Sequence, residues 1–237
     1  MNNNSRHGFT LMETLLAIAV VAVLLTSFLA VFGPATSSIR RAISVQDADR
    51  LASALEHELS TLRENETSDF DTSFEKAFEW IDSSGTLSDA VILFNYRGDP
   101  AQITSGSLDP YNDDESLGSP GQDYIVQSAV RRLSSSTDLE EFLEAVEGRS
   151  FVVRMTQLVA NENGGLEPST SGIVNSDGST ASDSDSFEEG VIAFQAEFYL
   201  LPANNSTYIN GPLAQGGSDF EDILGNPLFT RNMAVRR

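Results

Sequence analysis

The chain has 237 residues, with 14 basic and 35 acidic side chains, a net charge of −21 and no cysteine. A surface of that charge repels phosphate backbones, so a nucleic acid is excluded as the expected partner. The absence of cysteine excludes a disulfide framework and thiolate metal sites. Roughly 200 residues follow the apolar N-terminal part, enough for one compact domain with long loops.

The N-terminal part combines a short leader with a long apolar run. Residues 9–32 contain one charged side chain, Glu13. At about 1.5 Å per residue, a helix of that length reaches roughly 36 Å, and a bilayer core is about 30 Å thick. Because lipid offers the backbone no hydrogen bonds, a helix is the predicted form of this span. Gly33 and Pro34 follow it and predict either a kink or a break.

A charged leader, a glycine and a phenylalanine precede the run, in the order Arg6-His7-Gly8-Phe9-Thr10-Leu11-Met12-Glu13. This stretch resembles the class III signal of type IV prepilins and type II secretion pseudopilins. The resemblance implies that prepilin peptidase cleaves between Gly8 and Phe9, and that the new N-terminal Phe9 is N-methylated. It implies that subunits assemble through Glu13 and the apolar side chains of Leu11, Leu15 and Leu16.

Glu13 is the unusual residue of the span. A carboxylate inside an apolar span costs about 2.5–3.5 kcal/mol on insertion scales, so it needs a partner. The family pairs this glutamate with the amino group that cleavage frees on a neighbouring subunit. Glu13 also lies near the start of the helix, where the helix dipole favours negative charge.

Two alternatives to the prepilin signal remain. An ordinary secretory signal peptide has an apolar core of about 7–15 residues and a small-residue cleavage site. Here the core is longer, and an acidic residue separates Arg6 from it. A plain uncleaved anchor is the second alternative. Basic residues flank the span on both sides, at Arg6 and at Arg40 and Arg41, so the positive-inside rule alone is ambiguous.

The resemblance implies one pass through the bacterial inner membrane, with a cytoplasmic N-terminus and an extracytoplasmic (periplasmic) domain. It divides the chain into a leader (1–8), an assembly helix (9–33) and a globular domain (34–237). Apolar residues then recur on one helical face, at Ile39, Ile43, Ala48, Leu51, Leu55, Leu59 and Leu62. The helix is therefore predicted to continue over residues 34–63 and to pack on the domain, with Asp47, Asp49, Arg50, Glu56 and Glu58 placed elsewhere around it.

A separate surface helix is the alternative for residues 34–63. A long helix packed on a sheet is the pilin architecture, and residues 47–63 are similar to the corresponding helix of J-type minor pseudopilins. Further along, Phe70, Phe74, Phe78 and Ile81 predict a short helix with a capping box at Ser68 and Asp71. A second short helix is predicted from Thr137 to Gly148.

Apolar runs and alternation predict five strands, at residues 91–96, 124–133, 151–159, 191–201 and 228–235. Few helices separate them, so the expected fold class is α+β, with a long N-terminal helix on a mainly antiparallel sheet. Residues 99–122 and 204–226 read as loops. Residues 161–189 are rich in Ser and Asp and predict a long loop that is mobile or ordered by something external.

No catalytic motif is present in the sequence. His57 lies in Leu55-Glu56-His57-Glu58-Leu59, which is not a zinc-protease motif, and we expect it on a helix surface. No enzyme activity and no cofactor are predicted. Calcium is the one ion considered, because it prefers oxygen ligands. Its candidate ligands form two acidic clusters, Asp109, Asn112, Asp113, Asp114 and Glu115, and Asp177, Asp183, Asp185, Glu188 and Glu189.

The favoured hypothesis is a structural subunit, minor rather than major, of a type II secretion pseudopilus or a type IV pilus-like filament. Its implied partners are prepilin peptidase, other pilins or pseudopilins, the inner-membrane assembly platform and the membrane itself. A membrane-anchored binding protein that presents its loops to a ligand and never polymerises is the second hypothesis. A membrane-tethered hydrolase is the third.

Overall fold

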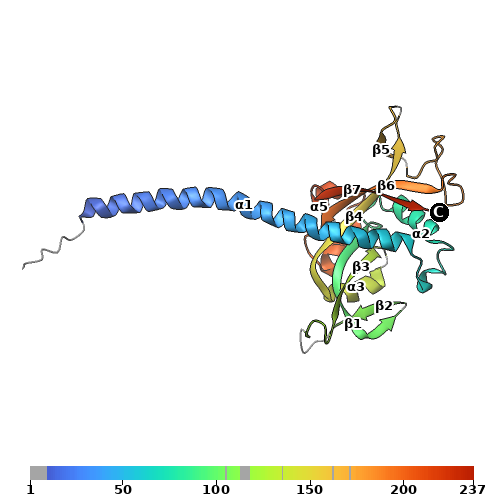
Figure 1. Ribbon diagram of the computed structural model, residues 1–237, viewed down its shortest axis with the longest axis horizontal. Coiled ribbons are helices and arrows are strands. Elements are labelled where there is room, and N and C mark those ends of the chain that lie inside the picture. The colour runs from blue at the N-terminus through green and yellow to red at the C-terminus, as the bar shows by residue number, and fades with distance from the viewer. Residues whose placement is uncertain (1–9, 105, 113–117, 135, 162, 171) are drawn as a thin grey trace, which may run out of the picture. The chain divides into compact units, whose positions relative to one another are not determined.

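The structure is a computed structural model that describes residues 10–104, 106–112, 118–134, 136–161, 163–170 and 172–237. It divides into two compact units, Met1–Ile43 and Ser44–Arg237. Helix α1 (Leu11–Ser60) runs from the first unit into the second (Figure 1). It continues through Pro34, so the break that this proline could have caused does not occur. The long helix confirms the prediction of one helix rather than two.

The second unit forms, in the described residues, one seven-stranded sheet whose strand pairings are all antiparallel. Its strands are β1 (Val91–Thr104), β2 (Ser107–Pro110), β3 (Ile125–Arg132), β4 (Val146–Ala160), β5 (Leu166–Pro168), β6 (Val191–Leu200) and β7 (Phe229–Arg236). The central order is β2-β1-β4-β6-β7, with β3 paired to β1 and β5 to β4. This is the α+β, pilin-like arrangement that was predicted.

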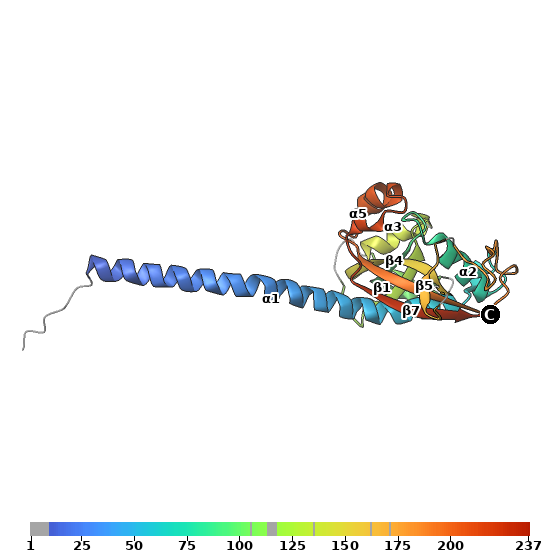
Figure 2. The same ribbon diagram turned by 90° about the horizontal axis from the view of Figure 1, so that it is seen from above.

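Helices cover both faces of the sheet (Figures 1 and 2). On one face lie the second half of α1 and helix α2 (Ser73–Ser83). On the other lie α3 (Ser136–Glu144) and the short helices α4 (Ser206–Tyr208), η2 (Ile209–Leu213) and α5 (Phe220–Leu224). Successive side chains of β6 point to opposite faces of the sheet. Phe198 packs into the core beneath α1 and α2, the first core, and Tyr199 packs into the core on the opposite face, the second core.

The packed face of α1 begins at Ser44. Ala48, Leu51, Leu55 and Leu59 are at most 2% exposed, as the helical spacing predicts. Ile39 and Ile43 were predicted on the same packed face, but they are 61% and 45% exposed. That part of the prediction is wrong, because both residues precede the stretch of α1 that meets the sheet.

Three predicted boundaries are also wrong. The cap of α2 is Thr72, whose hydroxyl accepts from the Glu75 N–H at 3.1 Å, and not Ser68. Gly148 lies inside strand β4 rather than at the end of α3, because α3 ends at Glu144 and its last turn leads directly into the sheet. Strand β1 continues beyond Gly98 through Pro100, where its register with β2 shifts so that the missing N–H of proline is tolerated.

The described part of residues 161–189 makes several contacts with the rest of the domain. Gln157 holds this segment to β4, since its side-chain amide donates to Val174 O at 2.8 Å and accepts from Val174 N at 2.7 Å. Ile173, Ala181 and Phe187 are buried in the first core. Through these few apolar residues, a segment that is otherwise polar packs against α2. Residues 204–226 likewise hold short helices, which bury Ile209, Leu213 and Phe220.

Lys76 is the only lysine of the chain and is fully buried. Its Nζ donates to Glu58 Oε1 and to Glu66 Oε2, both at 2.7 Å, and to Thr61 O at 3.3 Å. Glu58 also pairs with Arg63. Glu58 was predicted away from the packed face of α1, yet it is 5% exposed. Two cations offset the desolvation of its carboxylate, which allows this position.

Replacing Lys76 should therefore destabilise the domain strongly. We expect Lys76→Met to lower the free energy of unfolding by about 3–5 kcal/mol, because Glu58 is left buried with less compensating charge. The double variant Lys76→Met/Glu58→Gln should recover part of that loss. Urea unfolding of residues 36–237, followed by circular dichroism, measures both. As control, Arg149→Ala breaks a half-exposed pair with Asp47 and should cost at most about 1 kcal/mol; an equal cost for the two single variants would contradict the buried network.

Phe187 provides the corresponding test for residues 161–189. Its ring lies 6.3 Å from that of Phe74 and 6.2 Å from that of Phe78, and it is 1% exposed. Phe187→Ala should cost about 3 kcal/mol and open this segment to limited proteolysis. The exposed neighbour Asp185, changed to Ala, should leave both stability and cleavage near wild type. Equal behaviour of the two variants would show that the segment is not anchored by its aromatic residue.

Candidate functional site

The described part of the first unit has a mostly apolar surface. Every residue from 10 to 43 is exposed. The exposed side chains include the predicted assembly residues, with Leu11 at 81%, Leu15 at 58% and Leu16 at 64%. Among the described residues, α1 is the one helix whose length and composition suit a membrane span. The core helix of a soluble protein would be mostly buried, whereas no described residue buries this stretch.

Hydroxyl side chains within this stretch donate hydrogen bonds to backbone carbonyls of the same helix. The hydroxyls of Thr26 and Ser27 donate to Ala22 O and Val23 O, and that of Thr36 to Phe32 O, all at 2.8 Å. Such bonds remove the cost of placing a hydroxyl in lipid, where no water can replace them. Glu13 remains as the one ionisable side chain between residues 11 and 39.

Glu13 occupies the first turn of α1. Thr10 caps this turn, because its hydroxyl accepts from the Glu13 N–H at 3.3 Å and its carbonyl accepts from the Glu13 and Thr14 N–H groups. The carboxylate therefore lies at the positive end of the helix dipole, which stabilises it. Among the side chains that the structure describes, none forms an ion pair with Glu13. Gly8 and Phe9 lie outside the described residues.

Comparison with known proteins bears on this N-terminal segment. Residues 3–29 match the family of the prokaryotic N-terminal methylation motif, which carries the class III signal. The chain has the N-terminal signal of type IV pilins and pseudopilins. No curated protein and no solved structure matches it. For this pilin-like chain the motif points to a structural subunit, and the apolar helix that follows fits a membrane-anchored pilin.

The predicted calcium ligands of the pilin-like domain are engaged in local turns. Asp177 Oδ1 accepts from the Ser179 hydroxyl at 2.6 Å, and this bond lowers the pKa of the Asp177 carboxyl. Asp183 Oδ1 accepts from the Ser186 N–H at 2.7 Å, which lowers the pKa of that carboxyl. Hydrogen-bonded carboxylates of this kind are typical of turns. Asp185 is exposed.

The first acidic cluster is only partly described. Asp109 lies in β2 and accepts from the Thr104 hydroxyl at 2.9 Å. Asp113, Asp114 and Glu115 lie outside the described residues. Within the part of the chain that the structure describes, no three His, Asp or Glu side chains gather as a metal site would require. Calcium binding stays an untested prediction.

Two features of the domain were not predicted from the sequence. One is the buried network around Lys76, for which a signal existed: Glu58 lies three residues after Leu55, on the apolar stripe of α1. The other is a group of arginines, Arg63, Arg131 and Arg132, that line one pocket. Arg131 and Arg132 end a predicted strand. Nothing in the sequence indicates that Arg63, 68 positions before Arg131, lines the same pocket.

Proposed function

We propose that this chain is a structural subunit, minor rather than major, of a type II secretion pseudopilus or a type IV pilus-like filament. Prepilin peptidase cleaves it after Gly8, and Phe9 becomes the N-methylated N-terminus. The observation that carries the proposal is the exposed apolar stretch of α1, which lies largely within the matched residues 3–29 and holds a single acidic residue.

Assembly follows from the surface of α1. Before assembly only lipid can cover its apolar side chains, among them Leu11, Leu15 and Leu16. In a filament the same side chains pack against α1 of other subunits. The Glu13 carboxylate then gains a partner, because the amino group of Phe9 on a neighbouring subunit carries the opposite charge.

The location and partners belong to the same proposal. The precursor crosses the inner membrane once, with its N-terminus in the cytoplasm and Ser44–Arg237 in the periplasm. Its partners are the peptidase, other pilins and the assembly platform. A large domain with helices on both faces of its sheet supports a minor subunit, since it is bulky for repeated packing. Residues 47–63 are similar to the helix of J-type minor pseudopilins.

A membrane-anchored binding protein that does not polymerise is the second candidate. The observation that favours it is a pocket of about 750 Å³ in the domain, which a purely structural subunit does not need. The two candidates differ in what happens to the leader and to Glu13, so both can be tested in one system.

Processing is the first test. Co-expression with a prepilin peptidase should remove residues 1–8 and leave an N-methylated phenylalanine, which intact-mass and N-terminal peptide mass spectrometry detect. Gly8→Leu should block cleavage, because a bulky side chain prevents close approach to the backbone. Gly33→Ala, a change in α1 outside the signal, is the control and should be processed normally. An intact leader on the wild-type chain under these conditions would contradict the proposal.

Glu13 is the second test. Glu13→Gln should be cleaved normally but enter filaments at least about tenfold less, because the neighbouring amino group loses its charge partner. Glu13→Asp keeps the charge and should retain most of the incorporation. Sheared filament fractions, quantified by immunoblot against total cleaved subunit, measure the effect. Equal incorporation of the Gln variant and the wild type would refute the pairing.

A further inference from the structure

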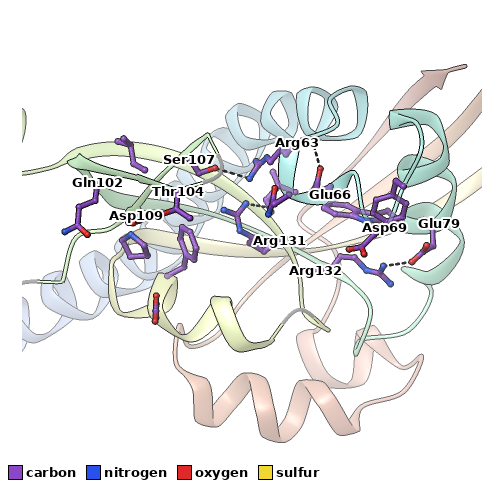
Figure 3. Close-up of a pocket in the computed structure, with 18 residues that line it drawn as sticks. Arg63, Glu66, Asp69, Glu79, Gln102, Thr104, Ser107, Asp109, Arg131 and Arg132 are labelled. Carbon is purple, nitrogen blue, oxygen red and sulfur yellow. Dashed lines mark hydrogen bonds and ion pairs between the residues drawn. The ribbon is translucent and has the colours of Figure 1, made fainter.

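A pocket of about 750 Å³ opens in the second unit between the segment after α1, the β1–β2 hairpin, the end of β3 and α3 (Figure 3). Its lining combines arginines with aromatic rings, notably Phe142 and Trp80. Figure 3 shows Arg131 near the middle of the group, between Asp109 on one side and Glu66 on the other. The pocket is separate from the apolar part of α1 that carries the proposed assembly function.

Arg131 differs from the other two arginines of the pocket. Arg63 pairs with Glu58, and Arg132 pairs with Glu79 at 2.7 Å. Arg131 instead lies over the ring of Phe142, 4.6 Å from its centre, and donates to the carbonyl of its neighbour Val130 at 2.9 Å. It takes part in none of the ion pairs between side chains that the structure describes.

The charge of Arg131 is costly where it lies. Burial, and next the positive charge of Arg63, lower the pKa of its guanidinium. Glu58 and Glu66 attract it, but both already accept a hydrogen bond from Lys76. A guanidinium on an aromatic ring, with donors left over, is well suited to hold a carboxylate through two parallel hydrogen bonds.

A purely anionic ligand does not suit the surroundings. The chain has a net charge of −21, and the pocket is also lined by the carboxylates of Asp69, Asp109 and Glu141. None of these three takes part in an ion pair among the described side chains. They repel an approaching anion but attract a cation. A ligand that carries both charges can pair with Arg131 through its carboxylate and with this acidic rim of Asp69, Asp109 and Glu141 through its cations.

We propose that this pocket binds a carboxylate flanked by positive charge, with Arg131 holding the carboxylate and Asp69, Asp109 and Glu141 holding the flanking cations. A segment of another protein chain, with an acidic side chain between basic ones, has this chemistry. A free amino acid has it too, in smaller form. The proposal concerns the domain alone and stands or falls independently of cleavage and filament assembly.

Calorimetric titration of the full-length chain in detergent micelles tests the proposal with defined probes. The end-capped tripeptide Arg-Glu-Arg should bind at least about tenfold more tightly than Arg-Gln-Arg, which has the same shape and cations but no carboxylate. Free glutamate and citrate complete the set. Arg131→Gln should weaken Arg-Glu-Arg by at least about tenfold, whereas Arg149→Gln, outside the pocket, should leave its Kd unchanged.

Each outcome decides a part of the proposal. Binding of the tripeptide without glutamate supports a protein segment as the ligand, and equal binding of glutamate supports a free zwitterion. Equal affinity for Arg-Glu-Arg and Arg-Gln-Arg, or no heat from either at millimolar concentration, would overturn the role of Arg131. Stronger binding of citrate than of Arg-Glu-Arg and of glutamate would overturn the role of Asp69, Asp109 and Glu141. Should Arg131→Gln fail to fold by circular dichroism, the comparison of the two peptides on the wild-type chain still decides.

Discussion

The two halves of helix α1 have different surfaces, and the rest of the structure depends on this difference. Up to residue 43, α1 is exposed and almost uncharged, and its hydroxyls bond to its own carbonyls. From Ser44 onward the same helix turns one stripe, including Leu51 and Leu55, into the core of the sheet. Hydrophobic burial stabilises this second half, together with its ion pairs to the rest of the domain. The first half has no such stabilisation until lipid or another subunit covers it.

Cations are scarce in this chain, and the structure uses them to join elements. Arg149 pairs with Asp47 and Arg231 with Asp49 and Glu56, which ties strands β4 and β7 to α1. Such half-exposed pairs contribute little stability each. Lys76 is different, since two carboxylates meet it in the interior. Arg131 differs from these cations, because it forms none of the ion pairs that the structure describes.

Patterns that repeat along the sequence predicted the main elements. The alternation of Ile192, Phe194, Ala196 and Phe198 identified β6, and the stripe from Ala48 to Leu59 identified the packed half of α1. Features made by residues distant in sequence could not be predicted in this way. Phe187 reaches α2 from a polar segment, and the burial of Glu58 depends on a lysine 18 positions later. Likewise, Glu13 was recognisable from its apolar neighbours alone, whereas the pocket around Arg131 required the fold.

The burial of Lys76 also has a chemical consequence. With its one lysine fully enclosed and held by two carboxylates, the folded domain exposes no lysine amine to solvent. Acylating dyes and crosslinkers that target lysine therefore do not reach Lys76 while the domain is folded. The same reagents modify Lys76 only when the domain opens, so labelling of this residue reports unfolding.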